Sequence, residues 1–162
     1  MGVRGARTGD VAGFLRLAGE VERWFGPMVD DPGFVAAVER HIGRSAALVA
    51  DGPEPTPLGG LLFGGRPPTY RIHWLVVAGA ARGQGVGRAL VAEAFRRYVA
   101  APGTVEVVTF GPDHPGAVDS GARVFYERLG FTPAEHTDPG PEGGSRQVFR
   151  RAVPATRTQP TR

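Results

Sequence analysis

The sequence predicts an α/β protein built on a mixed sheet, and three observations support this fold class. Two stretches of helical periodicity open the chain, and three apolar, strand-like runs follow them. A glycine-rich segment then joins the third run to an amphipathic helix, after which a further apolar run begins. A strand, a crossover helix and a second strand in this order form a parallel pair when the crossover has the usual right hand.

The first helices are predicted from typical helix starts that are followed by apolar residues at helical spacing. Thr8 is a suitable cap for the first helix, and Asp31-Pro32 is a suitable start for the second. The predicted buried faces are Val11, Phe14, Leu15 and Ala18 in the first helix and Phe34, Val35, Val38 and Ile42 in the second. We therefore expect two short helices before the sheet begins.

The first three strands are predicted as an antiparallel meander. The strand-like runs are 46–50, 58–63 and 70–77, and clusters of glycine and proline separate them. The helix that begins at Gly85 has an apolar face and stops before Pro102-Gly103.

Two further strands are expected in the C-terminal part of the chain. The next strand is 104–110, and after another helix Phe131 and the segment 147–152 complete the sheet. The glycine- and proline-rich segment 138–145 is predicted to be a loop. The length of 162 residues, with 41% hydrophobic residues, suits one globular domain.

The glycine-rich loop, residues 82–88, has the properties of an anion-binding site. Its sequence is Arg-Gly-Gln-Gly-Val-Gly-Arg, in which glycines let the backbone approach a ligand and the following helix directs its positive end at the same point. A nucleoside-triphosphate P-loop is excluded, because all 19 basic residues other than histidine are arginine and no lysine is present. The match to the dinucleotide-binding motif G-x-G-x-x-G/A is weak, since Arg88 stands where that motif needs a small residue.

Two motifs of the sequence resemble the signatures of the GNAT (GCN5-related) N-acetyltransferase superfamily and occur in the same order as in that superfamily. Arg82, Gly85 and Gly87 fit R/Q-x-x-G-x-G/A, and Tyr126 begins the sequence Y-x-x-L-G-F about 40 residues later. The resemblance implies a mixed central sheet of about six or seven strands, splayed between the fourth and fifth and flanked by about four helices. It covers a single domain over 1–152, and the remainder, 153–162, is expected to be a disordered tail.

The resemblance also implies which residues bind acetyl-CoA. The pantetheine arm would pair with the backbone of strand 70–77. The N–H groups of the glycine-rich loop would hold the pyrophosphate, with added positive charge from Arg82 and Arg88. Asp119 stands where many family members carry an asparagine that contacts pantetheine, and an ionised aspartate cannot donate a hydrogen bond. The complete set of expected acetyl-CoA contacts is Leu75, Val76, Val77, Arg82, Gly83, Gln84, Gly85, Val86, Gly87, Arg88 and Asp119.

Tyr126 is the implied general acid, because a phenol near the thioester sulfur can protonate the departing thiolate. The residue that removes the proton of the acceptor is left open. Strand alternation places His73 on the same face as Leu75 and Val77, with Ile72 and Trp74 on the other face, so His73 is one candidate base.

Glu22 is the second candidate base, because by resemblance its segment shapes the acceptor pocket. Asp113 and His114 follow the splayed strand and are also expected near that pocket. The alternative to a protein base is an amine that loses its proton in solution.

Composition narrows the partners. The net charge is only +3, and the sequence has no basic run interleaved with aromatic residues, which argues against a nucleic-acid partner. No apolar run approaches the length of a membrane span. We expect a cytoplasmic protein without a metal, and a homodimer is left open. The absence of cysteine excludes a thiolate zinc site and a cysteine nucleophile.

The expected activity is that of an acyltransferase transferring groups other than aminoacyl groups. The amine of a small molecule or a peptide N-terminus would attack acetyl-CoA directly within a ternary complex. The alternative is a non-catalytic acyl-CoA-binding sensor or partner module of the same fold.

Overall fold

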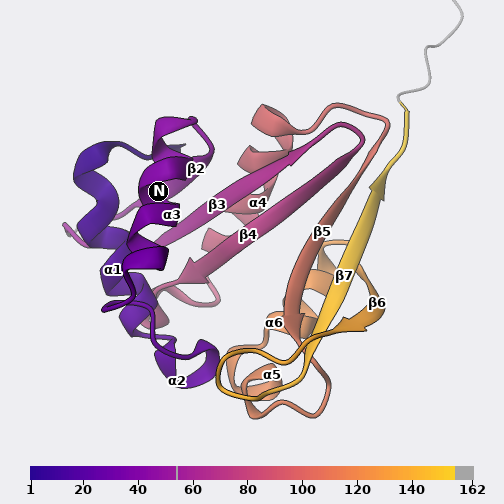
Figure 1. The fold of residues 1–162 in the computed structure, drawn as a ribbon. Coiled ribbons are helices and arrows are strands. Elements are labelled where there is room, and N and C mark those ends of the chain that lie inside the picture. Colours follow the sequence, from indigo (N-terminus) through magenta and orange to yellow (C-terminus); the bar gives the residue numbers. More distant parts are fainter. Residues whose placement is uncertain (54, 156–162) are drawn as a thin grey trace, which may run out of the picture.

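The computed structural model describes residues 1–53 and 55–155, and the segment 156–162 of the expected tail lies outside these residues. A seven-stranded sheet forms the centre of the molecule, with the order β1-β2-β3-β4-β5-β7-β6 (Figure 1). Only β4 and β5 pair in parallel; the other neighbours are antiparallel. The strands are β1 Gly2–Gly5, β2 Ala47–Asp51, β3 Gly59–Arg66, β4 Thr69–Val77, β5 Gly103–Phe110, β6 Thr132–Thr137 and β7 Arg146–Val153.

Six α-helices flank the sheet in the described part of the chain, where about four were expected. The additional ones are short: α2 has four residues and α5 has six. The bounds are α1 Val11–Gly19, α2 Glu22–Phe25, α3 Pro32–Gly43, α4 Val86–Tyr98, α5 Pro115–Ser120 and α6 Ala122–Arg128.

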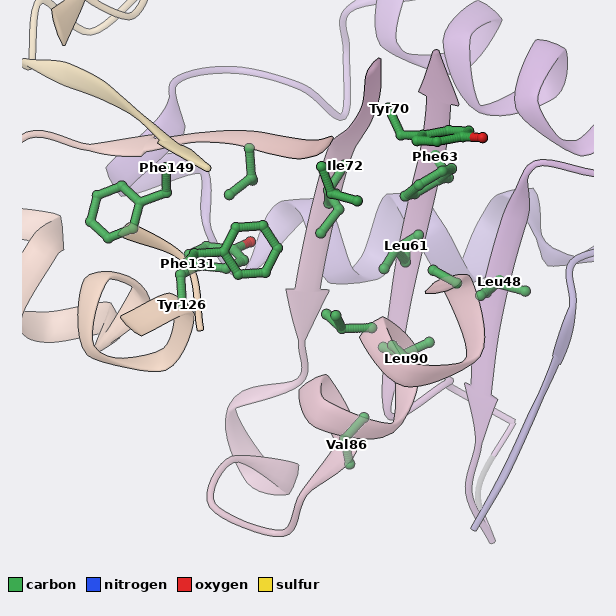
Figure 2. Close-up of a cluster of buried hydrophobic side chains, with 14 of the residues drawn as sticks. Leu48, Leu61, Phe63, Tyr70, Ile72, Val86, Leu90, Tyr126, Phe131 and Phe149 are labelled. Atoms are coloured by element: carbon green, nitrogen blue, oxygen red, sulfur yellow. The ribbon is translucent and has the colours of Figure 1, made fainter. Parts of the chain in front are cut away.

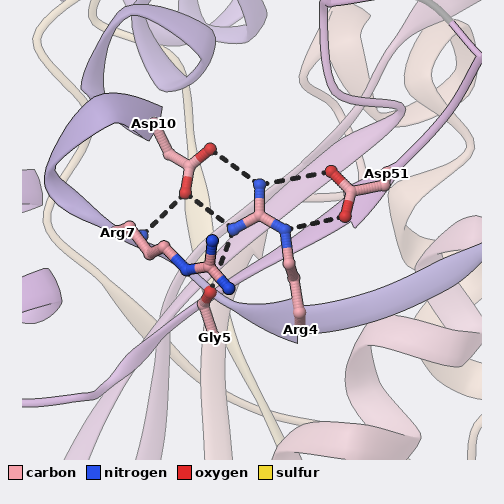
Figure 3. Close-up of polar contacts among 5 residues, drawn as sticks. All are labelled: Arg4, Gly5, Arg7, Asp10 and Asp51. Atoms are coloured by element: carbon pink, nitrogen blue, oxygen red, sulfur yellow. Dashed lines mark hydrogen bonds and ion pairs between the residues drawn. The ribbon is translucent and has the colours of Figure 1, made fainter.

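The first strand, β1, corrects the expectation that helices precede the sheet. It pairs antiparallel with β2 at the edge, although its sequence Gly-Val-Arg-Gly carries little intrinsic preference for a strand. Arg4 fixes this edge by ion pairs to Asp10 at 2.9 Å and Asp51 at 2.7 Å (Figure 3). Because these partners lie on different elements, the contacts join β1 to both the first helical turn and β2.

Helices cover the two faces of the sheet differently (Figure 1). On one face, α1 and α3 bury Phe14 and Val38 against β2 and β3. On the other, α4 buries Val86 and Leu90 in the largest core cluster, which Tyr126 also joins (Figure 2).

The expected splay between the fourth and fifth strands is confirmed. Pairing of β4 with β5 covers 69–72 and 104–107 and then ends. Beyond that point β4 stays with β3 as far as Val77, whereas β5 stays with β7 as far as Phe110, so the two strands diverge (Figure 1).

A bulge in β4 makes the expected alternation wrong. Ile72 pairs with Phe63 and Trp74 pairs with Leu62, so His73 has no partner on β3. As a result Ile72 lies on the α4 face of the sheet together with Leu75, and not with Trp74 as the alternation predicted. His73 instead approaches α3 on the opposite face, where its Nδ1 lies 2.8 Å from Nε2 of His41.

Candidate active site

A cleft of about 380 Å³ opens where β4 and β5 separate. The ends of these strands, the glycine-rich loop, the start of α4 and parts of α2 and α6 form its walls. Most of the predicted acetyl-CoA contacts line it, namely Leu75, Val76, Val77, Arg82, Gly83, Gly85, Val86, Gly87 and Arg88.

The glycine-rich loop owes its shape to backbone angles that favour glycine. Gly83 has φ +77° and Gly85, the N-cap of α4, has φ +81°, and a Cβ on either would meet no atom within 4 Å. Gly87 differs, because a Cβ there would lie 2.9 Å from the Phe125 ring. The first two glycines therefore set the turn, and the third permits close packing of α4 on α6.

Backbone donors at the start of α4 face this cleft without helical partners. The first bond of the helix joins the Ala89 N–H to the Gly85 carbonyl, and among residues 1–53 and 55–155 no side chain caps the N-terminus. The N–H groups of residues 86–88 are thus free for a ligand, and the dipole of a 13-residue helix adds positive potential there. This arrangement suits an anion such as a pyrophosphate.

Two predicted contacts do not line the cleft. The Gln84 side chain turns back to donate to the Ala80 carbonyl at 3.3 Å. Asp119 is exposed on α5, and the next residue, Ser120, lines the cleft instead. One step along a helix rotates a side chain by about 100°, so Asp119 and Ser120 face different directions.

Three arginines give the cleft a positive mouth. Arg82, Arg88 and Arg128 line it and are exposed, and within residues 1–53 and 55–155 none forms an ion pair. No carboxylate belongs to its described lining. Arg128 was not predicted, although it lies inside the second motif, because that motif is defined by its tyrosine, leucine, glycine and phenylalanine.

Tyr126 lines the same cleft from α6 and is only 5% exposed. Its ring packs against Phe131 and Phe149, at centroid distances of 5.6 and 6.3 Å (Figure 2). The ring of Phe125 is also near, with its centroid 5.0 Å away. Burial raises the pKa of the Tyr126 hydroxyl well above its ordinary value of about 10. The phenol is therefore a protonated donor over the whole physiological pH range.

The candidate bases lie elsewhere. His73 lines a separate, smaller cavity of about 130 Å³ beside Arg71 and Glu106, and its pKa is lowered by burial, by His41 and by Arg71. Glu22 does not line the cleft; its Oε2 accepts a hydrogen bond from the Met28 N–H at 2.8 Å and closes the turn after α2. The structure does not bring either residue together with Tyr126.

His114 belongs to a buried network that the sequence did not reveal. Its Nδ1 accepts from the Gly116 N–H at 2.8 Å, so its proton is on Nε2, which lies 3.1 Å from Glu142. Glu142 also pairs with Arg146 at 2.7 Å, and Asp113 accepts from the Ser145 hydroxyl. Neither Asp113 nor His114 lines the cleft. A pairing between two residues 28 positions apart in the sequence carries no local sequence signal.

Aromatic residues form the wall that continues from α2 to the end of β5. Trp24, Phe25 and Phe110 line the cleft, and the Phe25 and Phe110 rings are 4.7 Å apart. Arg82 places its guanidinium 5.0 Å from the Trp24 ring. The sequence did not indicate the contact between Trp24 and Arg82, because a stacking partner 58 residues away is invisible in the local pattern.

In the described ranges no group of three or more histidine, cysteine, aspartate or glutamate side chains is placed to hold a metal ion. None of the described helices combines the length and the apolar character needed to cross a bilayer.

Comparison with known proteins places this geometry in a family context. The family model described as an acetyltransferase (GNAT) domain matches residues 31–133. No curated protein matches the chain. A solved GNAT-family structure from Desulfovibrio desulfuricans is 21% identical with a TM-score of 0.72, over 93% of this chain and 98% of that one.

Two further solved structures resemble the chain. The ribosomal-protein-S18-alanine N-acetyltransferase of Escherichia coli is 15% identical with a TM-score of 0.68, over 99% and 98% of the two chains. The PaiA N-acetyltransferase of Thermoplasma acidophilum, solved with coenzyme A, is 16% identical with a TM-score of 0.68, over 94% and 98%. At these identities the likeness concerns the fold.

Proposed function

The chain belongs to the GNAT acetyltransferase family, and we propose that it transfers the acetyl group of acetyl-CoA to the primary amine of a small molecule or a peptide N-terminus. The observation that carries the proposal is the single cleft that joins a set of free backbone donors to a buried phenol. The glycine-rich loop contributes N–H groups, Arg82 and Arg88 to the lining of this cleft, and α6 contributes Tyr126.

The fit to acetyl-CoA follows from the chemistry of these groups. The N–H groups of residues 86–88, with Arg82 and Arg88, would hold the pyrophosphate. The backbone of 75–77 is free of β5, because pairing between the two strands ends at Ile72, and would hydrogen-bond the amides of the pantetheine arm. In this arrangement the arm runs into the splay toward Tyr126.

The proposed reaction is a direct transfer. The neutral amine attacks the thioester carbonyl, so that a C–N bond forms and the C–S bond breaks, and the sulfur leaves as a thiolate. Tyr126 donates its proton to that sulfur, and its raised pKa keeps the phenol protonated until then. The proton of the amine passes to solvent, and the tyrosinate regains a proton from solvent.

We infer that the acceptor sheds its proton before it enters the cleft. No carboxylate or imidazole belongs to the described lining, and the positive arginines disfavour an ammonium ion. An α-amino group is roughly one third neutral at pH 7.5, whereas a lysine amine is neutral in about one part per thousand. This difference supports a weakly basic amine, such as a peptide N-terminus, over a lysine side chain.

The test is thiol release from acetyl-CoA across a panel of amines that includes peptides with N-terminal alanine, the residue named for the Escherichia coli neighbour. Tyr126→Phe keeps the ring and removes the acid, so turnover should fall by about 10²–10⁴-fold while CoA affinity is retained. Tyr98→Phe is the matched control, since that hydroxyl bonds the Ser45 carbonyl away from the cleft. CoA binding without thiol release on any amine would favour the non-catalytic alternative.

A further inference from the structure

Two guanidinium groups lie over the indole of Trp24, and the surroundings of the ring hold it rigidly. Arg23 places its Cζ 4.3 Å from the ring centroid, and Arg82 places its Cζ 5.0 Å from it. Trp24 itself is only 5% exposed and packs with Leu17, Val21 and Phe110 in a core cluster. The ring therefore offers a fixed surface to any cation that stacks on it.

The two stacked arginines differ in where they belong. Arg82 is the first residue of the glycine-rich loop and lines the cleft, whereas Arg23 is exposed on α2 and does not. Arg82 follows a short turn at Gly79–Ala81 and has extended backbone angles, which leave its long side chain without support from a regular element. In the described residues it forms neither an ion pair nor a side-chain hydrogen bond, so the contact on Trp24 is what orients it.

We propose that Trp24 is a positioning residue, which holds the Arg82 guanidinium at the mouth of the cleft where it meets the pyrophosphate of CoA. This inference rests on the function proposed above. An unsupported arginine loses rotamer freedom when it binds an anion, and a side chain already held in place loses less. Stacking on an indole also leaves the N–H donors at the guanidinium edge free for an anion.

Through Trp24, the helix α2 then influences the affinity for CoA, although the sequence of α2 does not suggest this. Phe25, next to Trp24, packs on Phe110 of β5 and lies under the Arg146 guanidinium. Trp24 shares a core cluster with Val76 of β4, so α2 contacts both diverging walls of the splay. A change that shifts α2 would then alter the affinity for CoA through Arg82. No contact between Trp24 and the ligand is needed for this effect.

A double-mutant cycle on CoA binding tests the proposal, with the dissociation constant measured by calorimetry for the parent, Trp24→Phe, Arg82→Gln and the double variant. Cation–π stacking is worth a factor of about 2–30 in binding, and a phenyl ring is a weaker partner than an indole. We expect Trp24→Phe to weaken CoA binding by about 2–10-fold in the parent and to have no effect once Arg82 is replaced.

Arg23→Gln is the matched control, because it removes a guanidinium from the same indole without touching the cleft. Its CoA dissociation constant should equal that of the parent. Additive effects of Trp24→Phe and Arg82→Gln, or an effect of Arg23→Gln as large as that of Arg82→Gln, would overturn the proposal.

A truncated substrate separates positioning from general damage to the fold. S-acetylpantetheine carries the thioester but no pyrophosphate, so its kcat/KM should be unchanged in Trp24→Phe and Arg82→Gln. With acetyl-CoA the same variants should raise KM and leave kcat unchanged. Equal losses on both substrates would show a structural role for Trp24, whereas a parent protein that does not bind CoA would overturn the proposed function itself.

Discussion

Replacing Gly85 by alanine separates the two demands that the glycine-rich loop makes on this residue. The backbone at Gly85 has φ +81°, and a left-handed conformation costs an alanine about 1–2 kcal/mol. A Cβ there would meet no atom of the described residues within 4 Å, so no steric term adds to this cost. We expect the unfolding temperature of Gly85→Ala to fall by about 2–8 °C, since 1 kcal/mol corresponds to about 2–4 °C at this size.

The same substitution should also weaken CoA binding, because the open space at Gly85 is the space that we assign to the pyrophosphate. Gly143→Ala is the matched control: Gly143 has φ +83°, and a Cβ there also meets nothing within 4 Å, but it lies in the loop 138–145 and not in the cleft. Both variants should lose similar stability in thermal unfolding, and only Gly85→Ala should lose affinity in calorimetry.

Two results would refute this reasoning. If Gly85→Ala is as stable as the parent, the backbone angle does not require glycine. If Gly85→Ala and Gly143→Ala bind CoA equally well, the loop does not approach the pyrophosphate at Gly85.

Three further predictions follow from the titratable and charged groups. Because burial raises the pKa of Tyr126, turnover should not decline through its ionisation up to about pH 10, and a tyrosine-dependent descending limb near pH 9 would contradict the buried environment. The ascending limb should move with the pKa of the acceptor amine and persist in His73→Gln, whereas a limb that stays fixed and is lost in that variant would identify His73 as the base. Arg4→Gln should cost about 0.5–2 kcal/mol of unfolding free energy. The hydrogen bond from Arg4 lowers the pKa of the Asp10 carboxyl, so the stability that this pair contributes is complete above about pH 4 and is lost as the pH falls further. Urea titrations in which Arg4→Gln loses the same unfolding free energy at pH 7 and at pH 3 would contradict this.

The sequence predicted the central architecture because its periodicities are strong. The apolar runs of the meander and the amphipathic face of α4 agree with the tertiary packing, so local and global preferences coincide there. The strand β1 was missed, since Gly2 and Gly5 at its ends give no strand pattern and its stability comes from Arg4 contacts with distant residues. Pairing of this kind is decided by tertiary contacts.

The site was predicted in part for the same reason. The glycine-rich loop and Tyr126 belong to contiguous motifs, and both line one cleft. The predicted orientation of the His73 side chain was wrong because a bulge shifts the side-chain alternation of β4 by one residue. No local sequence signal marks that bulge. Trp24 was overlooked as a support for Arg82 because stacking depends on how α2 packs, which a single sequence does not encode locally.

The central claim is that acetyl-CoA occupies the cleft between the diverging strands, with its pyrophosphate on the glycine-rich loop. Hydrogen exchange of the backbone amides, measured by mass spectrometry with and without CoA, tests it most directly. Peptides that contain residues 75–77 and 83–88 should exchange more slowly when CoA is bound, and peptides from α3 beside His73 should not change. Unchanged exchange over 83–88 at saturating CoA, or protection confined to the small cavity beside His73, would contradict the assignment of the cleft.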